Sequence, residues 1–323
     1  MSQIEITVLK QGIPSRKVVT CCFFTVGDAY RDFKQYIGNL RRFVIDSEQL
    51  PDFEFRIYTD DTGQEYALEI AADYPRISVM HYNCPPFREG KGHSGMFGTL
   101  VRFLPMFEDL DVAWCSDIDI PRYYLDPALM RQMTHHKADI YISTHICYER
   151  HVRSNRKNSV VANKFITKVQ FPRALLTRFL NMIIDGKLDD KLEAINAENQ
   201  AKKTANPKPR SKIPYGTDEM FVNSYMYNWI VAKNLRVMVD RDYFAAWLLI
   251  KMLTKEQQRL ISQYMYRPSI SRFQHLKKIL EKAEIDPVFH EMECYKDFKE
   301  TLPKLKVSPI YRLLVNGESL EKI

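Results

Sequence analysis

Hydrophobic residues along positions 17 to 147 switch repeatedly between two spacings. Short runs rich in β-branched, aromatic and Cys residues, typical of strands, alternate with segments whose apolar residues recur at helical spacing. The predicted strands are 17–26, 53–59, 77–82, 111–115 and 139–147, and the predicted helices are 30–45, a segment through 66–71, 94–107 and 126–135. This alternation predicts an α/β fold with a mainly parallel central sheet covered on both faces.

The pattern is less regular after residue 150. The spacing there predicts a strand at 159–169, helices at 171–184 and 217–231, and a last strand at 235–239. Residues 186 to 213 are polar and include Asn206-Pro207-Lys208-Pro209, which cannot continue a helix, so we expect a mobile loop over the active site. We predict one domain over 1–240, with a helical, basic C-terminal extension over 241–323 packed on it.

The composition is that of an ordinary globular protein, with 323 residues, 45% of them hydrophobic and 27% charged. No apolar stretch approaches the ~20 residues that a transmembrane helix needs. Residues 1–11 contain no apolar signal core, and the six cysteines form no C-x-x-C pair. These features predict free, buried thiols in a cytoplasmic protein.

The net charge of +7 is concentrated in two basic clusters, which are Arg150, Arg153, Arg156 and Lys157 in the first and Lys202, Lys203, Lys208, Arg210 and Lys212 in the second. Each is either a solvated loop or a surface that attracts anionic ligands, such as a nucleoside diphosphate or an anionic acceptor. Neither cluster is interleaved with aromatic residues, so we do not expect nucleic acid as a partner.

An Asp-x-Asp pair, Asp117 and Asp119, follows the predicted strand 111–115 directly. Strand side chains alternate faces, so the two carboxylates point the same way. Their mutual repulsion is costly without a cation, and Mn²⁺ or Mg²⁺ binds through one or two carboxylates together with substrate phosphates. A polar turn is the simpler alternative, but the position after a buried strand favours a metal site that handles a nucleoside diphosphate.

Other candidate site residues lie at the predicted carboxyl ends of the strands, where ligands bind in parallel sheets. They are the corner Thr25-Val26-Gly27, then Asp60 and Asp61, and finally Ile118 within the Asp-x-Asp motif. Of these, Thr25, Val26, Asp60 and Ile118 are predicted to contact the nucleotide. Arg102, in the helix before the metal strand, is either a positive charge at this site or a surface arginine.

The run Gly90-Lys91-Gly92-His93-Ser94-Gly95 matches G-x-G-x-x-G, the fingerprint of dinucleotide-binding sites. Seven residues, including Pro85, Pro86, Phe87, Arg88 and Glu89, separate it from the preceding predicted strand, and two βα units come before it. A flexible loop facing phosphates or the acceptor is therefore favoured over a Rossmann dehydrogenase. A haloacid-dehalogenase phosphatase is also disfavoured, because its D-x-D normally lies on the first strand.

A second informative run spans residues 213 to 223. Thr217 is predicted to cap the helix that follows, and Asp218 and Glu219 are favoured by the positive end of that helix. If the helix begins at a pocket, either carboxylate could act as general base toward an acceptor hydroxyl or bind the donor sugar.

Taken together, these segments resemble a GT-A-fold glycosyltransferase that uses a nucleotide-sugar donor. The resemblance covers roughly residues 17 to 240 and rests on residues 24–30, Arg102-Phe103-Leu104-Pro105, Ser116-Asp117-Ile118-Asp119 and Tyr215-Gly216-Thr217-Asp218-Glu219-Met220-Phe221-Val222-Asn223. It implies that Thr25, Val26 and Tyr30 contact the nucleotide and that the Asp-x-Asp holds a metal on the diphosphate.

The resemblance further implies a UDP- or GDP-sugar as donor and a glycan, a protein or a lipid-linked molecule as acceptor. Many retaining members add a metal-binding His within His-x-x-Gly-x-x-Lys, and His275 and His290 lack that context. The third metal ligand and the stereochemical outcome therefore stay open. Two alternatives remain: an inactive nucleotide-binding scaffold of the same fold, and a sugar-phosphate nucleotidyltransferase, which normally has a richer glycine signature after its first strand.

Overall fold

The computed structural model describes residues 4–27, 33–118, 139–142, 162, 164–201, 208–239 and 303. The chain divides into two compact units, and the first comprises Met1–Asp119, Lys137–Ile142 and Val160–Met238. Nearly all described residues belong to this first unit. The predicted helix at 126–135, residues 143–147 of a predicted strand and almost all of the C-terminal extension lie outside the described residues.

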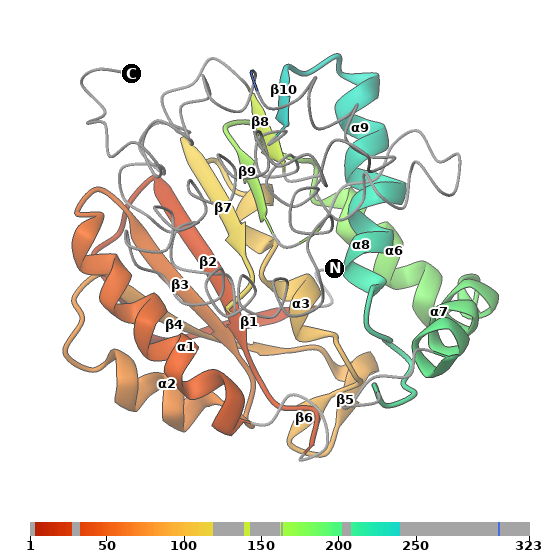
Figure 1. Ribbon diagram of the computed structural model, residues 1–323, viewed down its shortest axis with the longest axis horizontal. Helices are drawn as coiled ribbons and strands as arrows, with labels where there is room; N and C mark the ends of the chain where they lie inside the picture. Colours follow the sequence, from red (N-terminus) through yellow and green to blue (C-terminus); the bar gives the residue numbers. More distant parts are fainter. Residues whose placement is uncertain are drawn as a thin grey trace, which may run out of the picture. The chain divides into compact units, whose positions relative to one another are not determined.

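The centre of the first unit is an eight-stranded sheet in the order β1-β4-β3-β2-β7-β9-β8-β10 (Figure 1). Its strands are β1 (Glu5–Lys10), β2 (Lys17–Phe23), β3 (Glu54–Thr59), β4 (Ile77–Asn83), β7 (Val112–Ser116), β8 (Ile140–Ile142), β9 (Lys164–Thr167) and β10 (Val237–Val239). The four adjacent strands β4, β3, β2 and β7 are parallel, whereas β1 is antiparallel to β4, and β9 to both β7 and β8. The prediction of an α/β fold with a mainly parallel central sheet is confirmed.

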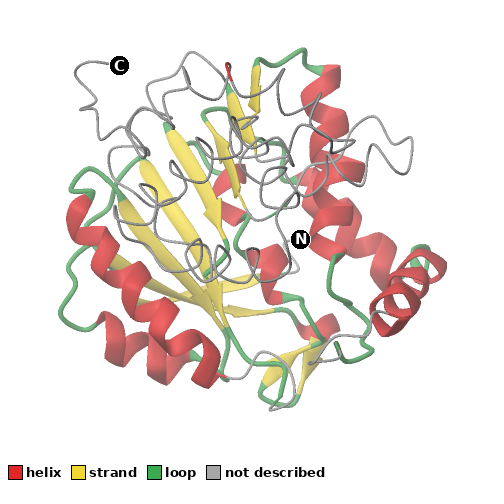
Figure 2. Ribbon diagram, in the orientation of Figure 1, coloured by secondary structure: helices red, strands yellow, loops and turns green. Residues whose placement is uncertain are grey.

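Helices flank this sheet, and a short hairpin lies beyond its edge (Figure 2). The helices are α1 (Phe33–Asp46), α2 (Gln64–Ala71), α3 (Gly98–Val101), α6 (Ala174–Ile184), α7 (Asp189–Ala201), α8 (Thr217–Phe221) and α9 (Tyr227–Ala232). A 3₁₀ helix, Leu104–Phe107, precedes β7, and a π-helix, Val222–Met226, joins α8 to α9. The hairpin consists of β5 (Arg88–Glu89) and β6 (Gly92–His93).

One face of the sheet is covered by α1 and α2. Phe23 of β2 packs against Phe33 of α1 with ring centroids 4.8 Å apart, and Phe55 of β3 meets Phe43 of α1 at 5.1 Å. These strand residues are fully buried because they point toward α1, whereas the residues that alternate with them point toward the opposite face.

The opposite face is covered by the segment containing α3 and, beyond it, by α6 and α8. The hydroxyl of Thr20 on β2 donates to the carbonyl of Arg102 at 2.7 Å. Phe221 at the end of α8 packs against Phe103, Phe107 and Phe179, which joins three helical segments in one aromatic cluster. This cluster fixes the start of α8 relative to the end of β7.

Residues 189–201 contradict the expected loop at 186–213, because they form α7. The inward positions of this helix are Leu192 and two polar residues, Asn196 and Asn199, all of them buried. The Asn196 and Asn199 side chains donate to the carbonyls of Ser211 and Tyr215, at 3.0 and 2.8 Å. The helix therefore buries amide groups that are hydrogen-bonded to the following segment, a pattern that apolar periodicity does not detect.

Two further differences concern local backbone chemistry. The predicted helix at 94–107 is limited to α3 and the 3₁₀ helix, since Pro105 has no N–H and cannot continue an α-helix. Strand β1 was not predicted, because it is an edge strand with mostly exposed or half-buried side chains.

The remaining predicted elements agree with the structure to within three residues at the ends that the structure describes, and residues 159–161 and 163 of the predicted strand 159–169 lie outside the described residues. The predicted helix at 217–231 corresponds to the continuous run α8, π-helix and α9. Cys21, Cys22 and Cys115 of the sheet are buried and form no disulfide, as predicted, and Cys84, just after β4, is likewise buried without a disulfide. Cys147 lies outside the described residues. Within the described part of the chain, no helix is long and apolar enough to cross a membrane.

Candidate functional site

The sheet has a topological switch point between β2 and β7. From β2 the chain adds β3 and then β4 on one side, whereas β7 pairs with the other side of β2. In open parallel sheets, ligands bind beyond the carboxyl ends of the strands at such a point. Here the switch point is bordered by Thr25, Val26 and Gly27 after β2 and by Asp117 after β7. These residues therefore lie at the carboxyl ends of their strands, as predicted.

The loop after β2 is held by local hydrogen bonds. Thr25 N–H donates to the hydroxyl of Thr62 at 3.2 Å, and Gly27 N–H donates to the hydroxyl of Thr25 at 3.2 Å. Gly27 has a φ of 93°, which favours glycine. Thr25 and Val26 are half-buried at this edge, and Tyr30 lies outside the described residues.

Arg102 connects the two acidic motifs. Its side chain is only 2% exposed, its Nη1 contacts Asp117 Oδ1, and its Nη2 donates to Asp218 Oδ2 at 2.8 Å. Nη2 also donates to the carbonyl of Ala162 at 3.1 Å. Arg102 is therefore buried at the centre of the site, and it brings Asp117 together with Asp218.

Burial by itself lowers the pKa of Arg102, but the electrostatic influence of Cys115, Asp218 and other acidic groups outweighs it. The net pKa is raised, so the guanidinium stays charged. The pKa of Glu219 is raised well above its usual value, first by burial and then by the charge and hydrogen bonding of Asp218. Arg102 offsets only part of this effect. Glu219 therefore keeps its proton to a higher pH than an ordinary glutamate.

Arg102 contacts Asp117 through Oδ1, and the Asp117 side chain is 31% exposed. Carboxylate oxygens are hard donors of the kind that Mn²⁺ and Mg²⁺ prefer, so the residue fits the predicted metal. Asp119 lies outside the described residues, and the described residues contain no group of three or more His, Cys, Asp or Glu able to hold a metal. The Ile118 side chain is buried, so a nucleotide could reach only its backbone.

The N-cap of α8 is not Thr217, as predicted, but the residue before it. Gly216, with a φ of 100°, occupies the N-cap, and Thr217 is the first helical residue. The Thr217 hydroxyl donates to the carbonyl of Pro214 at 2.6 Å, so it does not cap the helix. The π-helix begins three residues after Glu219, and the side chain of Asn223 donates to the Glu219 carbonyl at 2.7 Å. Such π-helical turns are frequent at functional sites.

Asp60 has no exposed surface, although we predicted it to contact a nucleotide. Its carboxylate accepts hydrogen bonds from Thr62, Tyr82 and His93. The neighbouring Asp61 lies half-buried at the same edge and contacts His81 Nε2, at 2.6 Å, and Arg88. Sequence reasoning missed Thr62 and His93, although Asp60-Asp61-Thr62-Gly63 has the composition of an Asp-initiated turn.

The glycine-rich run forms the β5–β6 hairpin and the segment after it. Gly90 makes the turn, with a φ of 58°, and Gly92 approaches Thr62, whose Cγ2 would lie 3.2 Å from an added Cβ. Gly95, with a φ of 49°, packs against Ser211 and Ile213. The glycines therefore serve a turn and close packing, and α3 after them has only four residues.

Of the basic clusters, only Lys208, Arg210 and Lys212 are described. The Lys208 ammonium lies 3.0 Å from the centroid of the Tyr215 ring, Arg210 pairs with Glu193 at 2.7 Å, and Lys212 lies over Phe87. Residues 150–157 and Lys202 and Lys203 lie outside the described residues.

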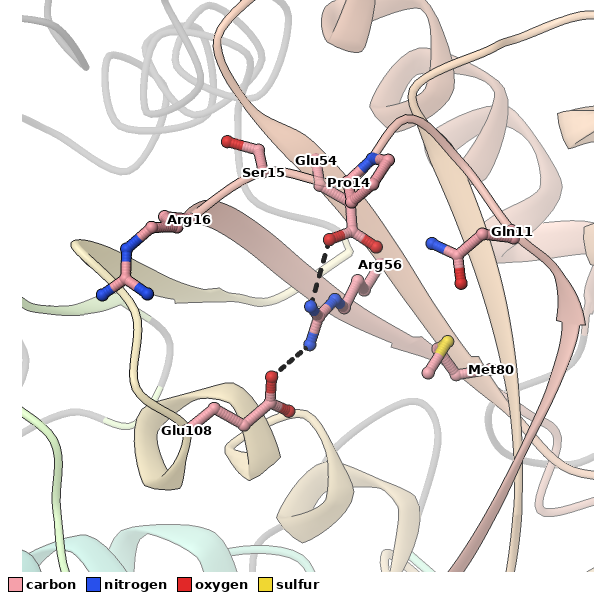
Figure 3. Close-up of a pocket in the computed structure, with 8 residues that line it drawn as sticks. All are labelled: Gln11, Pro14, Ser15, Arg16, Glu54, Arg56, Met80 and Glu108. Carbon is pink, nitrogen blue, oxygen red and sulfur yellow. Dashed lines mark hydrogen bonds and ion pairs between the residues drawn. The ribbon is translucent and has the colours of Figure 1, made fainter.

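A cavity of about 490 Å³ lies near the amino-terminal ends of β2 and β3, away from the switch point at the carboxyl ends (Figure 3). Its walls are Gln11, Pro14, Ser15, Arg16, Glu54, Arg56, Met80 and Glu108. Arg56 donates to Glu54 at 3.0 Å and to Glu108 at 2.7 Å, as Figure 3 shows. The Glu54 and Arg56 side chains are 3% and 14% exposed and form the floor of the cavity, whereas the Glu108 side chain is 39% exposed.

No protein-family model matches the chain, and a search of curated protein sequences found no match. The geometry of the switch point is therefore the main guide to function.

Proposed function

We propose that the chain is a metal-dependent glycosyltransferase of the GT-A fold that transfers a sugar from a nucleoside-diphosphate sugar to a hydroxyl acceptor. The observation that carries the proposal is the convergence of Asp117, from the end of β7, and Asp218, from the start of α8, on the buried guanidinium of Arg102. This convergence occurs at a switch point of the sheet, where nucleotides bind in related architectures.

In this proposal Asp117, together with Asp119, would hold Mn²⁺ or Mg²⁺ against the diphosphate of a UDP- or GDP-sugar. The ion, when bound, would neutralise charge that develops on the leaving nucleoside diphosphate. Thr25, Val26 and Tyr30 would contact the nucleotide. Arg102 fixes Asp117 and contributes a positive charge that is already in position before the donor binds.

The two carboxyl groups of α8 would have different roles. Asp218 is paired with Arg102 and is therefore suited to accept hydrogen bonds from the donor sugar. Glu219, whose raised pKa makes its ionised form a stronger base, is the better candidate to take the proton of the acceptor hydroxyl. This assignment suits an inverting reaction.

Calorimetric titration with UDP and GDP, each in Mn²⁺ and in EDTA, tests the nucleotide site. We expect metal-dependent binding by the wild-type protein, loss of that binding in Asp117→Asn, and retention in Asp109→Asn. Asp109 is a suitable control because its side chain is 83% exposed and pairs with Arg16 ahead of β2. Absence of metal-dependent binding, or unchanged binding in Asp117→Asn, would rule out the proposal.

Turnover is tested by incubating UDP- and GDP-sugars with Mn²⁺ and measuring release of the nucleoside diphosphate. We expect slow hydrolysis of at least one donor, which Asp117→Asn abolishes. Glu219→Gln should retain nucleotide binding, because the amide keeps the size of the side chain while removing the base.

A further inference from the structure

Asp60 is the centre of a buried hydrogen-bond network at the carboxyl end of β3. Oδ1 accepts the N–H of Thr62 at 3.0 Å and its hydroxyl at 2.5 Å, and Oδ2 accepts from Tyr82 Oη at 3.3 Å. Oδ2 also lies 3.1 Å from His93 Nδ1. A buried carboxylate is tolerated only with such donors, so the network holds Asp60 in one orientation.

The direction of each hydrogen bond in the network follows from the backbone. Cys84 N–H donates to His93 Nε2 at 3.0 Å, so Nε2 carries no proton and Nδ1 is the donor to Asp60. The Thr62 hydroxyl has one proton, and Asp60 accepts it. Its oxygen can therefore only accept from Thr25 N–H, which lies 3.2 Å away.

Close packing also connects the loop after β3, which contains Thr62, with the end of β2. An added Cβ at Gly63 would lie 2.7 Å from the carbonyl oxygen of Phe23, the last residue of β2. The loop after β3 therefore lies directly against the end of β2. From the other side, Gly92 of the hairpin approaches Thr62.

We propose that Thr62 is a positioning residue for the donor-binding loop, with Asp60 and His93 as the groups that orient it. The hydroxyl of Thr62 fixes Thr25 N–H, and through it the backbone of Thr25–Gly27 at the switch point. That the loop binds a nucleotide rests on the proposed function, whereas the hydrogen bond between Thr25 N–H and the Thr62 hydroxyl does not depend on it. Asp60 thus acts on the nucleotide through Thr62 and Thr25, without contacting it.

A loop held in this way loses less conformational freedom when a ligand binds. Loss of the Thr62 hydroxyl should therefore weaken nucleotide binding, even though Thr62 itself does not touch the nucleotide. One hydrogen bond of this kind corresponds to roughly a fivefold to tenfold change in affinity.

The test compares Thr62→Val and Thr62→Ser with Thr167→Val. The Thr167 hydroxyl likewise both donates and accepts: it donates to the carbonyl of Val169 at 2.7 Å and accepts from the N–H of Val169 at 3.0 Å. It is buried in β9, opposite Ala113 near the start of β7, so its loss should lower stability without reaching the switch point. Thr62→Ala serves as a second variant if Thr62→Val does not fold.

The first readout is hydrogen exchange of the Thr25 amide without ligand. We expect exchange at least about fivefold faster in Thr62→Val, and wild-type rates in Thr62→Ser and Thr167→Val. The second readout is the Kd for UDP or GDP in Mn²⁺, which should rise about fivefold to tenfold in Thr62→Val alone.

Unchanged Thr25 exchange in Thr62→Val and Thr62→Ala would overturn the positioning role. An equal loss of nucleotide affinity in Thr167→Val would overturn it too, because a general loss of stability would then be the cause. If the wild-type protein binds neither nucleotide, the proposed function fails, while the exchange measurement still decides the role of Thr62.

Discussion

The Nη2 atom of Arg102 lies 2.8 Å from Oδ2 of Asp218, and both side chains are almost fully removed from solvent. Because Arg102 also contacts Asp117, one guanidinium compensates two carboxylates that come from distant parts of the chain.

Arg102→Met should lower the free energy of unfolding by about 3 kcal/mol, because it removes the positive charge that faces the buried Asp218 carboxylate and the partly exposed Asp117 carboxylate. Urea denaturation measures this loss. Adding Asp218→Asn should recover part of the stability, since the amide is neutral. Arg16→Met, in an exposed ion pair, should have a much smaller effect. A loss as small as that of Arg16→Met would contradict the central role of Arg102.

Glu219→Gln should become increasingly stable relative to the wild type as the pH rises. The pKa of Glu219 is raised in the folded state, so its stabilising contribution is complete below the usual glutamate value of 4.5 and is lost as the pH rises through the raised pKa. Glutamine stays neutral and avoids that loss. Denaturation at pH 5, 6, 7 and 8 measures the difference, with Glu69→Gln on the exposed face of α2 as control. A difference that does not vary with pH would mean that Glu219 titrates normally.

Arg56→Met should destabilise the protein by roughly 3 kcal/mol, because Glu54 then remains charged on the floor of the cavity. Glu54→Gln in the same chain should restore much of that loss, since the amide can still accept from Ser78, which donates to Glu54 at 2.6 Å. Nucleotide affinity should be the same in both variants once folding is complete. A change in nucleotide affinity would show that the cavity at the amino-terminal ends of the strands is coupled to the switch point at their carboxyl ends.

Gly95→Ala should lower stability by more than about 2 kcal/mol, because its φ of 49° disfavours a side chain and the added Cβ meets Ser211 and Ile213. Gly38→Ala provides the matched comparison. Gly38 lies in α1 with open space around it, so alanine there should add about 0.5–1 kcal/mol. Thermal denaturation of the two variants should therefore give shifts of opposite sign.

The parallel strands could be predicted because each is a short apolar run between turn residues. The edge strand β1 could not, since its side chains are largely exposed and carry no burial pattern. Helix α7 was missed because Asn196 and Asn199 occupy positions where a periodicity argument expects apolar residues. Both elements therefore lack the apolar periodicity on which the predictions depended: β1 is an edge strand, and α7 buries two hydrogen-bonded amides.

The candidate site was predictable only in part. The positions of Asp117 and Thr25 follow from strand ends, which local sequence indicates. The convergence of Arg102 with Asp218 depends on how α8 packs, and this follows from the long-range aromatic contacts of Phe221. Asp60 lies at the carboxyl end of β3, as predicted, but it is buried and cannot contact a nucleotide. Its burial involves Tyr82 and His93, which come after α2 in the chain, so the local sequence does not indicate it.

The order β7-β9-β8 has a consequence for how the chain is made. The β2 partner of β7 has already been synthesised when β7 appears, but its other partner, β9, comes later in the chain than β8. At ~5–20 residues per second, the ribosome needs several seconds to deliver the roughly 50 residues before β9. During that time the apolar strand Val112–Ser116 has an open hydrogen-bonding edge, the kind of surface at which chaperones bind and nascent chains aggregate. The nascent chain should therefore be most vulnerable just before β9 emerges, well before its full length is reached.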